Sequence, residues 1–303
     1  MRQRLLFSVL CLLFLLPTAL HAQDTFDPAT VADINLDDIP VLPEVTETAR
    51  AIYERGHDAG RIPHSLSKVG DCMTASPNFL TPFSKAGEYN LGDYSDLQGV
   101  IDFFSAVAVR DDYSALSNPG LATTTGFTTA SVQDPIWADP AVCDSNESPL
   151  TCEYRVSNPA FALIMFGTND TTFFEADSFN RYLRQIIDQT IAADIVPILY
   201  TFPVRPEFPE KSVLFNQIIV QIARDYDLPL INLYRALEDL PDQGINLADP
   251  IHLSSPIDDN AGNFTPDNLE RGYTLRNLVT LQALDVILTQ LLEPQLAPEV
   301  STI

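Results

Sequence analysis

The sequence predicts a single-domain α/β protein built on an open, parallel central sheet. Three short apolar runs, at residues 160–166, 195–201 and 228–233, are typical of strands buried on both faces. Segments with helical spacing separate these runs, and a strand–helix–strand order favours parallel strands with helices covering the sheet. The chain has no internal repeat, low-complexity tract or interdomain linker, so one α/β domain over residues 61–293 is expected, followed by a short tail at 294–303.

The helices follow from their apolar spacing and from their end signals. Residues 23–60 form an acidic lead-in with one predicted helix at 44–60, where Gly56 and Gly60 end the apolar pattern. The stretch "HSLSKVGD" (64–71) then predicts a short strand. Further helices are predicted at 177–194 and 211–227, and a single long closing helix is predicted at 265–292.

The N-terminus resembles a secretory signal peptide at residues 1–22. Arg2 and Arg4 precede an apolar stretch over residues 5–16, and "ALHA" suggests cleavage after Ala22. A membrane anchor is the alternative, but the apolar run is short for a membrane span, and no later segment is long and apolar enough. We therefore expect a secreted, extracellular protein without stable membrane insertion.

The charge balance excludes some partners. The chain has 17 Lys and Arg residues against 41 Asp and Glu residues, a net charge of −24. Such an acidic surface repels nucleic acid and anionic membranes, which rules them out as expected partners. The charge does not identify a substrate.

The cysteines agree with export. Cys143 and Cys152 flank the polar stretch "CDSNESPLTC", and a disulfide between them is the simplest interpretation in an oxidising compartment. A loop of this length gains roughly 2–3 kcal/mol of stability from the cross-link. A metal site is the weaker alternative, because no CxxC motif or nearby histidine accompanies the pair. Cys72 is then the odd thiol.

Two glycine-containing stretches follow predicted strands or lie in loops where a ligand can bind. In an open parallel sheet, the ligand site lies beyond the carboxyl ends of the strands. "FGTND" (166–170) follows one strand, and Gly167 allows a turn that can aim the Asn169 amide at an anion. In "TTTGFTTASV" (122–131), Gly126 lets a ligand approach a free backbone N–H. An ordinary Asx-turn and an ordinary flexible loop are the alternatives.

The stretch "LADPIHLSSP" (247–256) carries a carboxylate and an imidazole three residues apart. In a turn, Asp249 can accept a ring N–H from His252 and orient the imidazole, as in the orienting half of a catalytic triad. A surface or structural histidine is the alternative. His57 and His64 have no carboxylate at comparable spacing in such a loop.

Four short motifs occur in a fixed order along the chain, each at a predicted loop of the sheet. They are Gly70-Asp71-Cys72, Gly126, Gly167-x-Asn169-Asp170 and Asp249-x-x-His252. This arrangement resembles the SGNH hydrolases, the GDSL lipase and esterase family, over roughly residues 64–292. The resemblance implies a flavodoxin-like α/β/α sandwich and hydrolysis of acyl esters without a cofactor or a metal. Its substrate would be a small-molecule acyl ester or an acylated glycan.

The resemblance also assigns roles to individual residues. It implies that Cys72 is the nucleophile, that His252 is the general base and acid, and that Asp249 orients His252. The backbone N–H groups of Cys72 and Gly126, with the Asn169 side chain, would form the oxyanion hole. Gly70, Asp71 and Gly167 would support these groups. The family has serine where this chain has Cys72.

Three interpretations of Cys72 remain open from the sequence. Cys72 is a working nucleophile, acidified by a helix N-terminus and by His252; or the site has lost hydrolysis and retains a ligand pocket; or Cys72 is a small buried filler. Under the third interpretation, Ser67 and Ser76 are the nearby hydroxyls, and neither is well placed. The chain has no G-x-S-x-G, HExxH, P-loop or GxGxxG motif to support another hydrolase or nucleotide-binding class.

Overall fold

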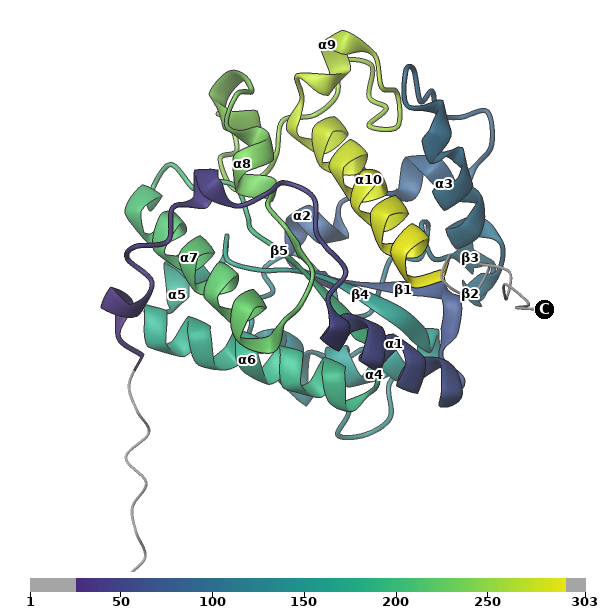
Figure 1. Ribbon diagram of the computed structural model, residues 1–303, viewed down its shortest axis with the longest axis horizontal. Coiled ribbons are helices and arrows are strands. Elements are labelled where there is room, and N and C mark those ends of the chain that lie inside the picture. Colours follow the sequence, from purple (N-terminus) through teal and green to yellow (C-terminus); the bar gives the residue numbers. More distant parts are fainter. Residues whose placement is uncertain (1–25, 293–303) are drawn as a thin grey trace, which may run out of the picture.

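A computed structural model of the protein describes residues 26–292. The predicted signal peptide at 1–22 and the predicted tail at 294–303 lie outside the described residues. The central sheet is parallel with four strands in the order β1-β4-β5-β6 (Figure 1). The strands are β1 (Ile62–Gly70), β4 (Pro159–Met165), β5 (Val196–Tyr200) and β6 (Leu230–Ile231). The four predicted strands are therefore present, and β6 is shorter than the predicted run at 228–233.

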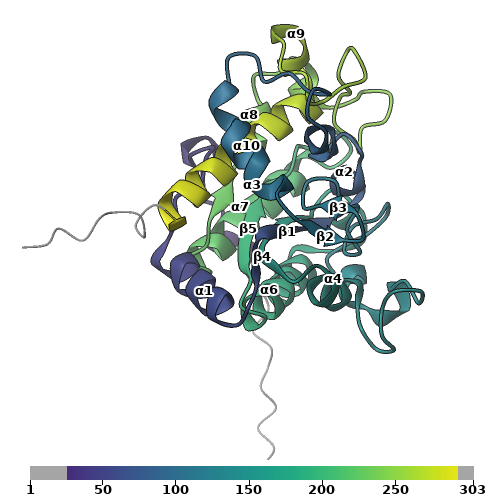
Figure 2. The ribbon, with the colours of Figure 1, turned by 90° about the vertical axis from the view of Figure 1, so that its right-hand side faces the viewer.

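Helices cover both faces of the sheet, as predicted for a three-layer α/β/α sandwich (Figure 2). Each crossover moves the chain one strand further in the same direction, and right-handed crossovers then place on one face the helix that directly precedes each of β4, β5 and β6. These helices are α4 (Pro149–Ser157), α6 (Ala176–Ala192) and α7 (Pro209–Tyr226). The opposite face carries α1 (Glu47–Asp58), α3 (Gln98–Ser105) and α10 (Gly272–Leu292).

Smaller elements complete the described chain. They are α2 (Cys72–Ala75), α5 (Asp170–Phe173), α8 (Leu233–Leu237), α9 (Pro266–Leu269) and the antiparallel pair β2 (Ala108–Arg110) and β3 (Tyr113–Ser114). None of the described helices is both long enough and apolar enough to cross a bilayer.

Aromatic contacts join the layers. Phe161 in β4 is fully buried, and Tyr53 of α1 stacks on it with ring centroids 5.5 Å apart, while Phe104 of α3 meets it edge-on at 6.1 Å. On the other side of the sheet, Phe179 of α6 and Phe215 of α7 stack at 4.2 Å. Burying each ring contributes about 1.5–3 kcal/mol, so these contacts hold the helices against the sheet that carries the site.

The closing helix is divided in two, which corrects the prediction of one helix over 265–292. Thr265 caps α9, as expected, but the helix stops at Leu269 and α10 begins at Gly272. The break lets the backbone of Gly272 pack against another segment, because a Cβ there would lie 2.1 Å from the carbonyl oxygen of Gly244. Ser254 Oγ also accepts a hydrogen bond from the Gly272 amide at 2.8 Å. The break therefore ties the segment that follows His252 to α10.

Candidate active site

The carboxyl ends of β1 and β4 bring two of the predicted motifs together. Gly70, the last residue of β1, pairs with Met165, the last residue of β4. The Gly70 amide donates to the Ala122 carbonyl at 3.1 Å, which brings the loop containing Gly126 to the same edge. Cys72 and Asn169 leave the sheet a few residues beyond this edge. The fold therefore gathers three of the predicted segments where an open parallel sheet binds its ligands.

The turn after β1 fixes the position of Cys72. Asp71 is the N-cap of α2, and its Oδ1 accepts a hydrogen bond from the Met73 amide at 3.1 Å. Gly70 must be a glycine, because a Cβ there would lie 2.5 Å from both the Met165 carbonyl oxygen and Thr74 Oγ1. Cys72 is the first residue of α2, and only 5% of it is exposed.

The thiol of Cys72 is less acidic than predicted. Burial and, to a smaller extent, the Asp71 carboxylate together raise the pKa of Cys72 to about 12, against smaller opposing effects of the Met73 and Cys72 amides. The expectation that a helix N-terminus acidifies this thiol is wrong, because α2 has only four residues and its dipole is small beside the effect of burial. At neutral pH the side chain is a protonated thiol that needs a base to react.

The predicted oxyanion donors Gly126 and Asn169 lie next to each other. Asn169 Nδ2 donates one hydrogen to the carbonyl of Phe127 at 2.9 Å, which leaves its second amide hydrogen for another acceptor. Gly126 has a φ of +86°, and its amide donates to no protein acceptor among the described residues. Gly167 has a φ of +134° and faces the ring of Phe202, where a Cβ would lie 2.1 Å away, so this turn also requires glycine.

Asp170, which the sequence did not single out beyond its motif, holds these donors in place. It is fully buried, and its Oδ1 accepts hydrogen bonds from the Thr129 amide at 2.9 Å and the Thr129 hydroxyl at 2.6 Å. Its Oδ2 accepts from the Gly167 amide at 3.2 Å. Burial raises the pKa of Asp170 to about 6. Asp170 therefore fastens the loop that contains Gly126 to the end of β4.

Asp249 and His252 make the contact that their spacing suggests. Asp249 Oδ2 lies 2.7 Å from His252 Nδ1, and the His252 amide donates to the Asp249 carbonyl at 2.9 Å within the same turn. The Asp249 side chain is 53% exposed and the His252 side chain 27% exposed. In the tautomer whose Nδ1–H donates a hydrogen bond to Asp249, the other ring nitrogen, Nε2, carries no proton and can act as a base.

The turn of His252 lies close enough to Cys72 for an electrostatic effect on the thiol, without a hydrogen bond between the two side chains. The Asp249 carboxylate contributes to raising the pKa of Cys72, and Tyr273, whose amide donates to the Ser254 carbonyl at 3.2 Å, interacts electrostatically with the same thiol. Within residues 26–292, no hydrogen bond joins the sulfur of Cys72 to a ring nitrogen of His252. Proton transfer between them therefore requires a closer approach or a bridging water.

The other two described histidines lie elsewhere. His57 is exposed on α1, with Nδ1 3.7 Å from Asp58 Oδ1. His64 belongs to β1, where its ring packs on Phe103 at 4.1 Å and its Nδ1 lies 2.9 Å from the Phe103 carbonyl oxygen. His64 is thus inside the strand rather than in front of it, and neither ring is part of the site.

A buried arginine that the sequence analysis missed lies beneath Cys72. Arg276 of α10 donates from Nη1 to the Met73 carbonyl at 2.8 Å and from Nη2 to Thr74 Oγ1 at 3.1 Å. Its guanidinium lies 3.7 Å from the centre of the Phe79 ring. Among the described residues it forms no ion pair with a carboxylate, and its Nε has no partner. The signal in the sequence is a single charged residue, Arg276, in the otherwise uncharged run "LRNLVTLQAL" (275–284).

Asp71 and Arg276 are both buried, and each side chain is only partly hydrogen-bonded. Asp71 Oδ2 has no partner in the described chain. Burial raises the pKa of Asp71 to about 7, and the positive charge of Arg276 opposes the shift. Burial lowers the pKa of Arg276. Buried polar atoms are nearly always hydrogen-bonded, so unpartnered atoms next to a nucleophile position indicate a site rather than a purely structural contact.

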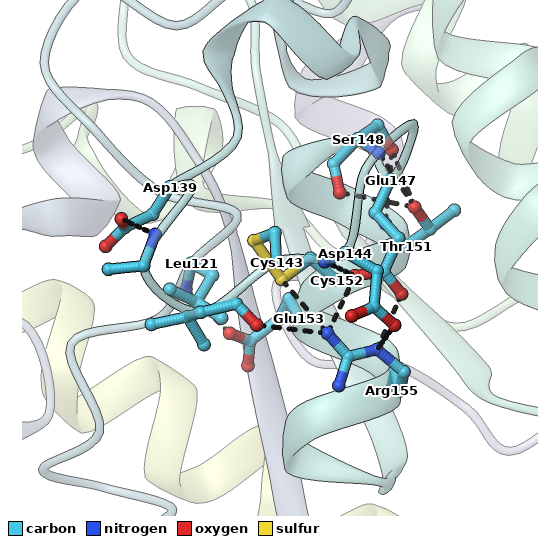
Figure 3. Close-up of a disulfide and its surroundings, with 12 residues drawn as sticks. Leu121, Asp139, Cys143, Asp144, Glu147, Ser148, Thr151, Cys152, Glu153 and Arg155 are labelled. Atoms are coloured by element: carbon cyan, nitrogen blue, oxygen red, sulfur yellow. Dashed lines mark hydrogen bonds and ion pairs between the residues drawn. A yellow bond between two sulfur atoms is a disulfide. The ribbon is translucent and has the colours of Figure 1, made fainter.

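The predicted disulfide between Cys143 and Cys152 is present, and other contacts tie the same segment (Figure 3). Cys152 lies inside α4 rather than at the end of a loop, because Ser148 and Thr151 form a capping box that starts the helix. Arg155 holds Glu147 with two hydrogen bonds of 2.6 and 2.7 Å. Cys143, Glu147 and Cys152 are the one group of potential metal ligands among the described residues, and the disulfide consumes both sulfurs.

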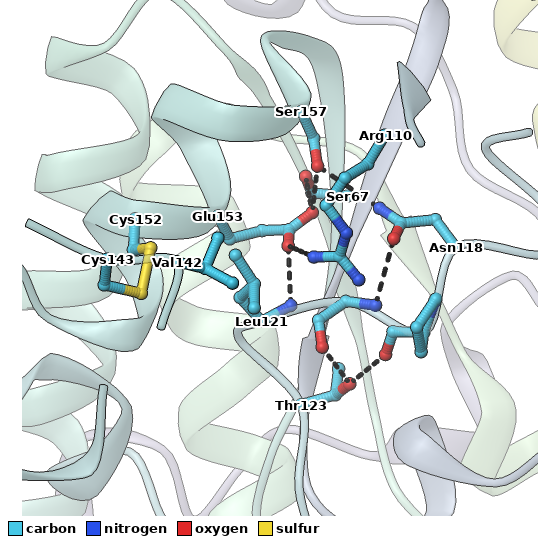
Figure 4. Close-up of polar contacts among 12 residues, drawn as sticks. Ser67, Arg110, Asn118, Leu121, Thr123, Val142, Cys143, Cys152, Glu153 and Ser157 are labelled. Atoms are coloured by element: carbon cyan, nitrogen blue, oxygen red, sulfur yellow. Dashed lines mark hydrogen bonds and ion pairs between the residues drawn. A yellow bond between two sulfur atoms is a disulfide. The ribbon is translucent and has the colours of Figure 1, made fainter. Parts of the chain in front are cut away.

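A third buried carboxylate, Glu153, belongs to α4, which packs against β1 (Figure 4). Its Oε1 accepts hydrogen bonds from the hydroxyls of Ser67 at 2.7 Å and Ser157 at 2.8 Å. Its Oε2 accepts from the Leu121 amide at 2.6 Å and lies 3.7 Å from Arg110 Nη1. This cluster, Ser67, Arg110, Leu121, Glu153 and Ser157, is called the Glu153 cluster below. Within this cluster, the Ser67 hydroxyl is buried and donates its hydrogen to Glu153, so Ser67 is not free to act as the nucleophile of the site.

Comparison with known protein families identifies part of the chain. Residues 109–256 match the model of the GDSL-like Lipase/Acylhydrolase family. Residues 109–256 therefore carry a GDSL-like lipase/acylhydrolase domain. The matched region of this GDSL-type hydrolase contains Gly126, Asn169, Asp249 and His252, and it begins after Cys72.

Solved structures of GDSL-type and other esterases align with most of this hydrolase. A psychrotrophic esterase from Pseudoalteromonas is 16% identical with a TM-score of 0.45, over 75% of this chain and 99% of that one. A GDSL-like lipase from Bacteroides thetaiotaomicron is 14% identical with a TM-score of 0.43, over 79% and 98%. An acetyl xylan esterase from Geobacillus stearothermophilus is 14% identical with a TM-score of 0.44, over 73% and 94%. A search of the curated proteins found no match.

Proposed function

We propose that this GDSL-type hydrolase is a secreted esterase that cleaves carboxylic acyl esters with Cys72 as nucleophile, His252 as general base and acid, and Asp249 as its orienter. The observation that carries the proposal is the 2.7 Å contact between Asp249 Oδ2 and His252 Nδ1 in the loop whose carboxylate acts on the Cys72 thiol. It leaves Nε2 as the base that a protonated thiol requires.

The first half of the reaction forms a thioester. The Cys72 sulfur attacks the ester carbonyl carbon while its proton moves to His252 Nε2, and the carbonyl oxygen becomes an oxyanion. The amides of Cys72 and Gly126 and the second Nδ2 hydrogen of Asn169 donate to that oxygen. When the tetrahedral intermediate collapses, the C–O bond breaks and His252 returns the proton to the leaving alkoxide, which departs as the alcohol.

The second half regenerates the enzyme. His252 takes a proton from a water molecule as its oxygen attacks the thioester carbonyl, and the same donors hold the second oxyanion. The C–S bond then breaks, the acid is released and the proton returns to sulfur. Asp249 stabilises the imidazolium in both halves, without itself accepting the proton.

A ligand-binding protein without catalysis is the second candidate. The buried, protonated thiol favours it, because burial raises the pKa of Cys72 to about 12 and lowers the population of reactive thiolate. The same fact makes a prediction that separates the two candidates. A thiol that depends on His252 behaves like a serine hydroxyl, so an active enzyme retains hydrolysis in Cys72→Ser.

The test is hydrolysis of p-nitrophenyl acetate by the purified protein and its variants. Cys72→Ala and His252→Ala are each expected to lower kcat by about 10³-fold or more, and Asn169→Ala by about 10²–10³-fold. His57→Ala is the matched control, since His57 also lies beside an aspartate but on the exposed surface of α1. Its kcat should equal that of the wild type. A native protein without activity that gains it only in Cys72→Ser would support the ligand-binding candidate instead.

Export is the remaining part of the proposal. Its support is the basic and apolar pattern of residues 1–22 together with the disulfide, which persists in oxidising compartments. Expression of the full chain in a secreting host is expected to release a protein whose N-terminal sequence starts at Gln23. An uncleaved chain retained in the cell would contradict export without affecting the esterase assignment.

A further inference from the structure

A pocket of about 390 Å³ opens beside Gly126. This volume falls within the range of about 300–1,000 Å³ that is usual for small-molecule sites. The lining residues are Thr124, Thr125, Gly126, Phe127, Ser131 and Trp137. Because Gly126 lines the pocket, an ester whose carbonyl oxygen is bound by the Gly126 N–H would place one of its attached groups next to or inside this pocket.

Trp137 gives the pocket an exposed aromatic wall. It ends a short 3₁₀ helix, Pro135–Trp137, and 60% of it is exposed. Large aromatic residues normally bury most of their surface, so an exposed indole that lines a pocket is available to a ligand. Trp137 is also the one tryptophan of the whole chain. Its neighbour Ile136 is 79% exposed and does not line the pocket.

The rest of the lining favours a neutral, hydroxylated ligand. None of the six lining residues is charged. Thr124 and Thr125 are exposed, and their hydroxyls make no hydrogen bond to protein atoms within residues 26–292. An alkyl chain in this space would remove water from both hydroxyls and return no hydrogen bond, which costs free energy. A sugar ring suits both walls, since its C–H face packs on an indole and its hydroxyls bond to threonine.

We propose that this pocket binds the sugar ring of an acylated carbohydrate, stacked on Trp137, with the ester carbonyl at Gly126. The position of the ester rests on the proposed function, whereas the binding of the sugar does not require hydrolysis. The substrate class is then a sugar esterified with a small acyl group rather than a long-chain lipid ester.

The experiment measures binding directly, with 6-O-acetylglucose as the probe and the Cys72→Ala variant as the protein, so that turnover cannot consume the probe. Because Trp137 is the sole tryptophan, the tryptophan fluorescence of the protein reports on this pocket alone. We expect a saturable change in emission. Saturation-transfer NMR on the sugar protons then gives the same affinity by an independent signal.

Two further substitutions, each made on Cys72→Ala, locate the site by NMR. Trp137→Ala is expected to weaken binding of 6-O-acetylglucose about tenfold or more, and Ile136→Ala, the matched control, to leave it unchanged. Equal weakening by both substitutions would overturn the proposal, as would emission that does not respond to the sugar. Tighter binding of ethyl octanoate than of 6-O-acetylglucose would overturn it in favour of an acyl-chain site.

The result is separable from that for hydrolysis. Sugar binding lost in Trp137→Ala, in a protein that never cleaves p-nitrophenyl acetate, supports the pocket and contradicts the esterase. Hydrolysis that depends on Cys72, in a protein whose Trp137 emission ignores the sugar, supports the esterase and contradicts the pocket.

Discussion

Two buried carboxylates, Glu153 of α4 beside β1 and Asp71 at the carboxyl end of β1, have opposite environments. Glu153 accepts three hydrogen bonds, from the hydroxyls of Ser67 and Ser157 and from the Leu121 amide. It also lies 3.7 Å from Arg110 Nη1, an atom that itself has no hydrogen-bond partner among the described residues. Asp71 has one oxygen that caps α2 and one oxygen without a partner among the described residues. Arg276 below it likewise has an unpartnered Nε.

The difference separates structure from function. A buried carboxylate whose hydrogen bonds are all made stabilises its surroundings, and removing it leaves several donors unsatisfied. A buried charge whose bonds are incomplete costs stability, and such groups are concentrated at functional sites. The Glu153 cluster therefore holds the loop that leads to Gly126, while Asp71 and Arg276 set the electrostatic environment of Cys72.

The largest expected effect comes from breaking the Glu153 cluster. Glu153→Ala leaves the Leu121 amide, two serine hydroxyls and the Arg110 charge buried without their acceptor, so we expect a loss of about 3–5 kcal/mol in the free energy of unfolding. Urea denaturation followed by circular dichroism measures it. Glu147→Ala is the control, because Glu147 is another α4-side glutamate paired with an arginine but near the surface. A loss in Glu153→Ala as small as that in the control would contradict the structural role.

The next largest effect is a pH dependence that belongs to Asp71. The pKa of Asp71 in the folded protein is raised to about 7, well above its value in the unfolded chain. The stability contributed by the neutral carboxyl is therefore present below about pH 4 and is lost as the pH rises through about 7. Asp71→Asn keeps the cap but cannot ionise.

Between pH 5 and pH 8, the wild type should lose about 2–4 kcal/mol more stability than Asp71→Asn. The comparison of urea midpoints for both proteins at both pH values isolates this one group, because all other titrations are shared. Parallel pH profiles for the two proteins would mean that Asp71 is not the incompletely bonded carboxyl described above.

The third effect is that of the disulfide beside the Glu153 cluster. Replacing both Cys143 and Cys152 by serine removes a cross-link that spans nine residues of sequence, with an expected loss of about 2–3 kcal/mol. Thermal unfolding of the wild type and the double variant measures it. Activity toward p-nitrophenyl acetate should change little below the unfolding temperature, since the disulfide touches no proposed catalytic group. A large loss of activity in a folded double variant would show that this side of β1 also acts on the site.

The smallest expected effect concerns the charge of Arg276. Arg276→Gln keeps a donor for the Met73 carbonyl but removes the positive charge near the thiol, and Arg276→Lys keeps the charge. Losing a buried opposite charge raises a thiol pKa by roughly one unit, so we expect iodoacetamide to alkylate Cys72 about tenfold more slowly in Arg276→Gln than in Arg276→Lys at pH 9. In urea the two rates should be equal. Equal rates in the folded proteins would remove Arg276 from the electrostatics of the site.

The sequence predicted the sheet better than the surroundings of the site. Apolar runs such as residues 160–166 carry their own evidence of burial, and the Asp249 to His252 spacing already indicated a side-chain contact. The break before Gly272 was not predictable, because it depends on the carbonyl of Gly244, a contact between segments that sequence periodicity does not report.

The acidity of Cys72 was predicted wrongly for a similar reason. A helix N-terminus is visible in the local sequence, whereas the burial that outweighs its effect on the pKa of Cys72 arises only from the tertiary fold. Arg276 and Trp137 differ from their neighbours in the chain only by residue type. Only the fold shows that Arg276 lies next to Cys72 and that Trp137 lines the same pocket as Gly126.

The esterase assignment requires that an acyl group be transferred to Cys72. The most direct measurement is intact-protein and peptide mass spectrometry after brief mixing of the wild type with p-nitrophenyl acetate and acid quenching. We expect one acetyl group per chain, on the peptide that contains Cys72, lost again on incubation in buffer and absent from Cys72→Ala. Hydrolysis of the ester by a protein that never carries an acetyl group on Cys72, or that carries it equally in Cys72→Ala, would contradict the mechanism.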